Sequence, residues 1–288
     1  MLTLRQLWAD TTDVLGSRHE ARWLCEVASG LDGSDFAAAL DEPLTERMVA
    51  HHDSMLARHR AGEPLQYVLG RWGFRRLDLL VDRRVLIPRP ETEQVAEVAI
   101  ELAAQVRERR AVADLGTGSG AIGLSMAFEL PLDGTTVWIT DASQDALDVA
   151  RANLVGIGRA ASNVRIGHGS WFAALPPDVR FDVIVSNPPY VAVASPLLAE
   201  SVAQWEPASA LFAGTDGLDD IRFLVAHAED HLAVGGWLVL EIGTDQGQAV
   251  QALLNAAGFC EIEIRQDVAG HDRIAIGRAD PTREILRG

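Results

Sequence analysis

The chain has 288 residues, 48% of them hydrophobic, which is enough to fill one large α/β domain and a small companion domain. Its formal net charge of −16 disfavours a nucleic-acid partner, because binding to phosphates depends on clustered cations. All 25 basic residues are arginine, which excludes a pyridoxal Schiff base and the lysine of a phosphate-binding loop.

Cysteine usage and hydropathy narrow the class further. Cys25 and Cys260 are the only cysteines, which excludes a disulfide framework and any motif that needs three cysteines. No apolar run reaches the length of a membrane span, and the first residues lack a signal-peptide pattern. We therefore expect a cytoplasmic protein that does not bind a membrane, and the net charge adds that it does not bind a nucleic acid directly. We also expect a monomer.

Short amphipathic helices are predicted for residues 1–70. Apolar residues recur at helical spacing in each, and a helix over residues 45–60 stops before Gly62 and Pro64. We expect His51 and His52 to lie on a solvated face of that helix. Residues 71–90 show short apolar runs with arginine pairs between them, which indicates a hairpin linker.

Residues 91–288 are predicted to form a doubly wound, mainly parallel α/β sheet of seven strands. A helix is expected from Glu91 to Arg110, since acids occupy its first turn and arginines its last. Strands and helices then alternate, and a short loop joins the last two strands, which should therefore pair antiparallel. The expected strands span residues 112–115, 136–140, 164–166, 181–186, 237–242, 261–265 and 273–276.

A glycine-rich loop follows the first predicted strand of this sheet and opens a helix. Such a loop at the carboxyl end of a strand is where open α/β sheets bind ligands. Its spacing also fits a dinucleotide-binding pattern, with Asp141 about twenty residues further on, so the loop alone does not separate a dehydrogenase from a methyltransferase. The loop consists of Asp114, Leu115, Gly116, Thr117, Gly118, Ser119 and Gly120.

Two aspartates favour the methyltransferase. Asp114 precedes the glycines at a strand tip, where its carboxylate could face the ammonium group of a methionine moiety, which a dinucleotide lacks. Asp141 ends the next strand, where it could accept hydrogen bonds from both hydroxyls of a ribose.

The tetrapeptide Asn187, Pro188, Pro189 and Tyr190 follows a buried strand beside that loop. Its two prolines lack backbone donors, so the segment offers acceptors only. A planar NH₂ group could donate to the Asn187 side-chain carbonyl and to the Pro188 carbonyl, while Tyr190 stacks on it. Because an amide nitrogen is a poor nucleophile, a methyltransferase acting on it needs such a holder.

The sequence resembles the peptide chain release factor glutamine N5-methyltransferases, also called the HemK family, over nearly its whole length. Besides the glycine loop and the tetrapeptide, the resemblance rests on Gln66-Tyr67-Val68-Leu69-Gly70 and on Val85 to Glu93, which reads Val-Leu-Ile-Pro-Arg-Pro-Glu-Thr-Glu. Later matching segments are Glu206-Pro207, Asp216-Gly217-Leu218, Leu240-Glu241-Ile242-Gly243 and His271-Asp272-Arg273.

This resemblance implies a class I methyltransferase fold and a methyl transfer from S-adenosylmethionine to the N5 amide nitrogen of a glutamine. That glutamine belongs to the Gly-Gly-Gln motif of class I peptide chain release factors. Residues 1–70 would dock the release factor, residues 71–90 would be the linker, and residues 91–288 would bind the cofactor and catalyse.

By the same resemblance, residues 116–120 would line the methionine and ribose, and Trp171 would pack on the adenine. Many relatives carry an acid before the aromatic pair, whereas this chain has Ser170, whose hydroxyl can still accept a hydrogen bond from the adenine amino group. Asn187, Pro188 and Tyr190 would serve catalysis. Glutamine methylation of a ribosomal protein, adenine N6-methylation and a dehydrogenase remain the alternatives.

Overall fold

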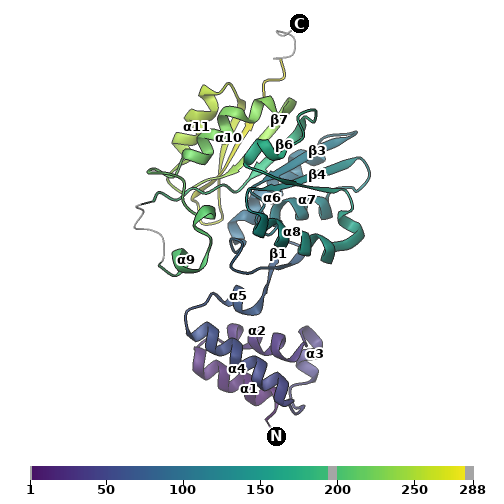
Figure 1. Cartoon of the computed structure of the whole chain (residues 1–288), viewed down its shortest axis with the longest axis vertical. Helices are drawn as coiled ribbons and strands as arrows, with labels where there is room; N and C mark the ends of the chain where they lie inside the picture. Colours follow the sequence, from purple (N-terminus) through teal and green to yellow (C-terminus); the bar gives the residue numbers. More distant parts are fainter. Residues whose placement is uncertain (1, 194–199, 283–288) are drawn as a thin grey trace. The chain divides into compact units, whose positions relative to one another are not determined.

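The computed structural model describes residues 2–193 and 200–282, and contacts divide the chain into two compact units, Met1–Arg71 and Trp72–Gly288. Figure 1 shows the first unit as helices and the second as a sheet flanked by helices. Among the described residues, no helix has both the length and the apolar content needed to cross a membrane.

The first unit is built from helices, as predicted. Thr3, Ser17 and Thr45 each accept a hydrogen bond from a backbone N–H in the first turn of the helix that follows. Apolar residues on the inner faces of the helices, such as Leu24 and Met55, form the core. The helices are α1 (Leu4–Leu15), α2 (Arg18–Ser29), α3 (Gly33–Ala38), α4 (Glu46–Arg60) and α5 (Leu65–Leu69).

The prediction of a solvated His52 is wrong. Its side chain lies in the interior at 1% exposure, with Nε2 2.9 Å from the hydroxyl of Thr11, which is also buried. The helix period places His52 on the same face as Met55, and the Thr11 hydroxyl satisfies the ring nitrogen there.

The second unit carries a seven-stranded sheet in the order β5-β4-β3-β6-β7-β9-β8, which confirms the predicted fold class. All neighbouring strands pair parallel except β9, which runs antiparallel to β7 and β8 as predicted. The strands are β3 (Arg110–Leu115), β4 (Thr135–Asp141), β5 (Val164–His168), β6 (Phe181–Ser186), β7 (Leu232–Glu241), β8 (Cys260–Gln266) and β9 (Asp272–Arg278).

Alternate residues of the central strands face opposite layers of helices. Val112 packs with α6, α7 and α8, whereas its neighbour Ala113 packs with α10 and α11. Figure 1 shows these two groups of helices on opposite sides of the sheet. The helices of this unit are α6 (Pro90–Ala104), α7 (Ala121–Glu129), α8 (Gln144–Ile157), α9 (Glu200–Trp205), α10 (Asp219–His227) and α11 (Gly247–Ala256).

The segment before the sheet differs from the prediction in one boundary. Strands β1 (Arg71–Phe74) and β2 (Leu77–Leu80) pair as a hairpin. Helix α6 ends at Ala104, so the helix predicted to reach Arg110 is too long. Arg110 instead begins β3, where it pairs with Thr135, and its guanidinium donates to the carbonyl of Val106 at 2.8 Å.

Candidate active site

A cavity of about 240 Å³ lies at the carboxyl ends of β3, β4 and β6. Strand order reverses there, since the chain runs from β3 outward to β5 and then returns to β6 on the other side of β3. Open α/β sheets bind their ligands at such a reversal. The predicted site residues that line the cavity are Asp114, Gly116, Thr117, Gly118, Ser119, Asp141, Ser170, Trp171, Asn187 and Pro189.

The glycine loop follows β3 in a backbone conformation that favours glycine. Gly116 and Gly118 have φ values of 70° and 56°. A Cβ on Gly116 would lie 3.2 Å from the Trp171 ring. Gly120 also has a positive φ, of 89°, but it precedes α7, and the cavity lining does not include it. Its predicted contact with the cofactor therefore stays a prediction.

Asp114 holds an unpaired acceptor at the cavity. Its carboxylate is 1% exposed, and Oδ2 accepts hydrogen bonds from the Thr117 hydroxyl at 2.5 Å and the Gly123 backbone N–H at 2.8 Å. The other oxygen, Oδ1, is buried without a hydrogen-bond partner among the described residues. Burial raises the pKa of this carboxyl to about 6. A buried acceptor of this kind fits a cationic donor such as an ammonium group.

Asp141 is held rigidly at the end of β4. Its Oδ2 accepts from the Gly118 N–H at 3.0 Å, and its Oδ1 accepts from the Ser143 N–H at 2.8 Å. Each oxygen keeps further acceptor capacity. The carboxylate can therefore receive a pair of hydroxyl donors, such as those of a ribose, while it also orders the glycine loop.

Trp171 and Ser170 share the cavity with an acid that the sequence did not single out. The Trp171 backbone has a φ of 48°, which is unusual for a residue other than glycine. Its side chain hydrogen-bonds to Asp220 from α10, and Asp220 also lines the cavity. Burial raises the pKa of the Asp220 carboxyl. The one sequence signal that could have drawn attention to Asp220 is its position as the second of two acids at the start of a helix.

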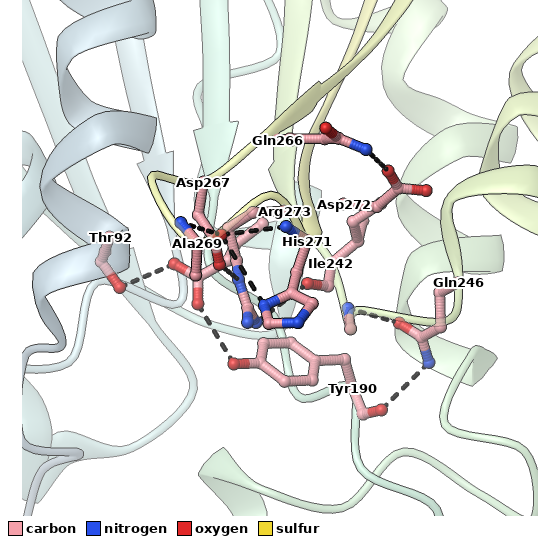
Figure 2. Close-up of polar contacts among 12 residues, drawn as sticks. Thr92, Tyr190, Ile242, Gln246, Gln266, Asp267, Ala269, His271, Asp272 and Arg273 are labelled. Atoms are coloured by element: carbon pink, nitrogen blue, oxygen red, sulfur yellow. Dashed lines mark hydrogen bonds and ion pairs between the residues drawn. The ribbon is translucent and has the colours of Figure 1, made fainter.

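The tetrapeptide 187–190 places its side chains in two directions. Asn187 and Pro189 line the cavity, and Pro188 is buried. The Tyr190 hydroxyl instead donates to Glu241 at 3.2 Å, and the Tyr190 carbonyl accepts from Gln246 at 3.0 Å (Figure 2). The cavity lining does not include Tyr190, so its stacking on an acceptor group stays a prediction.

Thr92 and Glu241 are further polar residues of the site that reasoning from the sequence left without a role. Both lie in segments quoted for the family resemblance, one at the start of α6 and one at the end of β7. The Asn187 side-chain amide donates to the Thr92 hydroxyl at 3.2 Å, and that hydroxyl donates to Glu241 at 2.6 Å. This contact could not be read from the sequence, because it joins residues far apart in the chain.

Comparisons with known proteins agree with this architecture. Family models described as PrmC N-terminal domain and Methyltransferase small domain match residues 11–70 and 97–204. The release factor glutamine methyltransferase of Xylella fastidiosa strain Temecula1 is 45% identical over 238 residues, which are 83% of this chain and 84% of that protein. That of Burkholderia pseudomallei is 43% identical over 262 residues, 90% and 91% of the two chains. The solved structure of a methyltransferase from Pyrococcus furiosus shares the fold, with a TM-score of 0.51 and 20% identity over 79% of this chain and 99% of that one.

Proposed function

Because this chain belongs to the release factor glutamine methyltransferases, we propose that it transfers a methyl group from S-adenosylmethionine to a glutamine side-chain amide nitrogen. The glutamine is that of the Gly-Gly-Gln motif in class I peptide chain release factors. The observation that carries this proposal is the position of Asn187, at the wall of a cavity that is also lined by Asp114, whose buried Oδ1 has no hydrogen-bond partner among the described residues.

The lining residues fit the cofactor group by group. Asp114 would accept from the methionine ammonium, Asp141 would accept from the ribose hydroxyls, and Trp171 would pack against the adenine. When bound, the cofactor supplies an electrophilic methyl group on a positively charged sulfur.

Asn187 and the Pro188 carbonyl would hold the acceptor amide. A glutamine NH₂ has two donors, and two accepted hydrogen bonds return electron density to a nitrogen that shares its lone pair with the carbonyl. Holding that nitrogen in line with the methyl group can remove roughly 7 to 11 kcal/mol of barrier. The proton leaves after transfer has begun, so no neighbouring base is required beforehand.

We propose that the first unit recognises the protein substrate, because the site around Asn187 would recognise only a planar amide. A planar amide is common to every exposed glutamine, so we propose that residues 1–70 dock the release factor. Acting on a translation factor, the enzyme would work in the cytoplasm, as a monomer, and without direct binding to nucleic acid.

A methylation assay tests this function. The protein is incubated with labelled S-adenosylmethionine and, separately, with class I release factors, ribosomal proteins and DNA, and any methyl group is located by peptide mass spectrometry. We expect the label on the glutamine of the Gly-Gly-Gln motif. A label on a ribosomal-protein glutamine or on adenine, with none on the release factors, would refute the proposal.

Replacement of the Asn187 side chain separates catalysis from cofactor binding. In Asn187→Ala we expect turnover to be nearly abolished, while the affinity for S-adenosylhomocysteine stays within a few-fold of wild type. The reason is that the side-chain carbonyl of Asn187, which this substitution removes, would contact mainly the amide of the substrate glutamine. Unchanged turnover in this variant would remove Asn187 from the proposed mechanism.

A further inference from the structure

A chain of hydrogen bonds leads from a buried carboxylate to the side chain proposed to hold the acceptor. Glu241, at the end of β7, is 1% exposed. Its Oε2 accepts from the Thr92 hydroxyl at 2.6 Å and its Oε1 accepts from the Tyr190 hydroxyl at 3.2 Å (Figure 2). Thr92 Oγ1 in turn accepts from Asn187 Nδ2 at 3.2 Å.

While Glu241 is ionised, the hydrogen bonds between Asn187, Thr92 and Glu241 can have only one direction of donation. A carboxylate has no proton to give, so the Thr92 hydroxyl must donate to it. A hydroxyl has a single proton, so Thr92 can then only accept from Asn187. The Asn187 amide must therefore turn Nδ2 toward Thr92, which leaves its carbonyl Oδ1 free for another donor.

The opposite orientation of the amide is disfavoured on both sides. It would set Asn187 Oδ1 against a lone pair of Thr92 Oγ1. It would also turn the Asn187 NH₂ toward the substrate glutamine, whose own NH₂ needs an oxygen as its hydrogen-bond acceptor. Burial raises the pKa of the Glu241 carboxyl above its usual range, while the Thr92 hydrogen bond and the positive charge of Arg273 act against that rise and favour the ionised form. The Arg273 guanidinium lies close by and donates to the carbonyl of Ile242 at 3.3 Å (Figure 2).

We propose that Glu241 is a positioning residue, which acts through Thr92 to hold the Asn187 amide with its carbonyl oxygen available to the substrate. This inference rests on the proposed function, in which Asn187 accepts from the glutamine NH₂. It assigns a task to two residues that do not transfer the methyl group. The task requires an acceptor at position 241 and a hydroxyl at position 92.

Matched pairs of variants test these two requirements. Thr92→Val keeps the shape and removes the hydroxyl, whereas Thr92→Ser keeps the hydroxyl. Glu241→Leu removes the acceptor, whereas Glu241→Gln can keep its oxygen toward Thr92 and donate its NH₂ to the Tyr190 hydroxyl. We expect Thr92→Val and Glu241→Leu to lower kcat about tenfold or more, and Thr92→Ser and Glu241→Gln to stay within about threefold of wild type. The Kd for S-adenosylhomocysteine should stay within about threefold in all four.

A spectroscopic readout tests the orientation without any activity. The Asn187 side-chain amide is assigned in ¹⁵N-labelled full-length protein as the NH₂ signal that disappears in Asn187→Ala. We expect one of its two protons to be shifted downfield and protected from exchange in wild type and Thr92→Ser, and both to be ordinary in Thr92→Val and Glu241→Leu.

The outcomes separate this inference from the proposed function. If the wild type methylates no release factor, the proposed function fails, and the amide signal alone decides whether Glu241 orients Asn187. If the wild type is active and folded Thr92→Val matches it in kcat, the inference is overturned. It is also overturned if Thr92→Ser is as impaired as Thr92→Val, or if the Asn187 protons are alike in all variants.

Discussion

Asp114 carries the carboxyl whose protonation we expect to control cofactor binding. Its pKa is raised to about 6 by burial, so the carboxyl is ionised at pH 7.5 and protonated at pH 5. Only the ionised form pairs with the ammonium of the cofactor. We therefore expect the Kd for S-adenosylhomocysteine, measured by titration calorimetry, to weaken about tenfold for each pH unit below 6. Asp114→Asn should bind more weakly and show no such dependence, and a wild-type Kd that is flat from pH 7.5 to 5 would contradict this role.

Asp220 adds a carboxylate to the wall of the cavity that Ser170 also lines. Because Asp220 hydrogen-bonds with Trp171, which we propose to pack on the adenine, and lines the cavity, we expect it to accept a hydrogen bond from the adenine amino group. We expect Asp220→Ala to weaken cofactor binding by about 1.5 to 3 kcal/mol, the scale of a charge-assisted hydrogen bond. Adding Ser170→Asp to that variant should restore part of the loss in the same titration. Equal affinity of Asp220→Ala and wild type would show that the acid plays no part.

The residues of the cavity differ in how well the sequence predicts them. Asp114 and Asp141 lie at the carboxyl ends of β3 and β4, and Asn187 directly follows β6. Because the carboxyl ends of parallel strands meet at one edge of a sheet, the proximity of these residues was predictable. Thr92 and Asp220 lie at the starts of helices, and their contacts depend on how those helices pack on the sheet. Local sequence carries no signal for that packing.

Among the elements, the hairpin of β1 and β2 is tied to two helices by one arginine. Arg75 in its turn donates to both oxygens of Glu129 in α7, at 2.7 and 2.9 Å, and to the Glu93 carbonyl in α6 at 3.0 Å. The side chains of Arg75 and Glu129 are only 17% and 11% exposed. The ion pair is therefore shielded from water far better than a surface pair.

Loss of that arginine should destabilise the second unit. Arg75→Ala leaves the Glu129 carboxylate nearly buried and unpaired, so we expect the free energy of unfolding to fall by about 3 kcal/mol. Urea unfolding followed by circular dichroism measures it. The exposed neighbour gives the matched control, since Arg76→Ala should change stability by less than about 0.5 kcal/mol. Equal effects of the two substitutions would show that the ion pair contributes little.

The predicted boundaries of an element were wrong where strand pairing, rather than the local sequence, decides where the strand begins. Strand β7 begins at Leu232 and includes Gly235 and Gly236, whereas the sequence predicted a start at Trp237. Pairing explains the difference. Phe181 lies opposite Leu232 while Val183 lies opposite Trp237, so the strand passes through an irregularity that contains the glycines.

At the scale of the whole molecule, strand directions followed from connection lengths, but strand order did not. Helical crossovers require parallel neighbours, and the short turn before β9 requires an antiparallel hairpin. From the sequence alone, either β8 or β9 could have paired with β7. The structure places β9 there, with Ile274, Ala275 and Ile276 buried, and leaves β8, where glutamates alternate with isoleucines, at the edge. That alternation marks a strand with one solvated face.

The division of the chain into two units permits a test of how they share the work. Binding energy gathered by residues 1–70 can offset the cost of ordering a flexible substrate loop in a pocket that recognises only a planar amide. We expect a protein that begins at Trp72 to bind S-adenosylhomocysteine with near-wild-type affinity and to lose methylation of the intact release factor. A short peptide with the Gly-Gly-Gln motif is the control, because it has no docking surface, and both proteins should methylate it at similar, slow rates. If the truncated protein is folded by circular dichroism and methylates the intact factor at the full-length rate, the helices of the first unit do not dock the substrate.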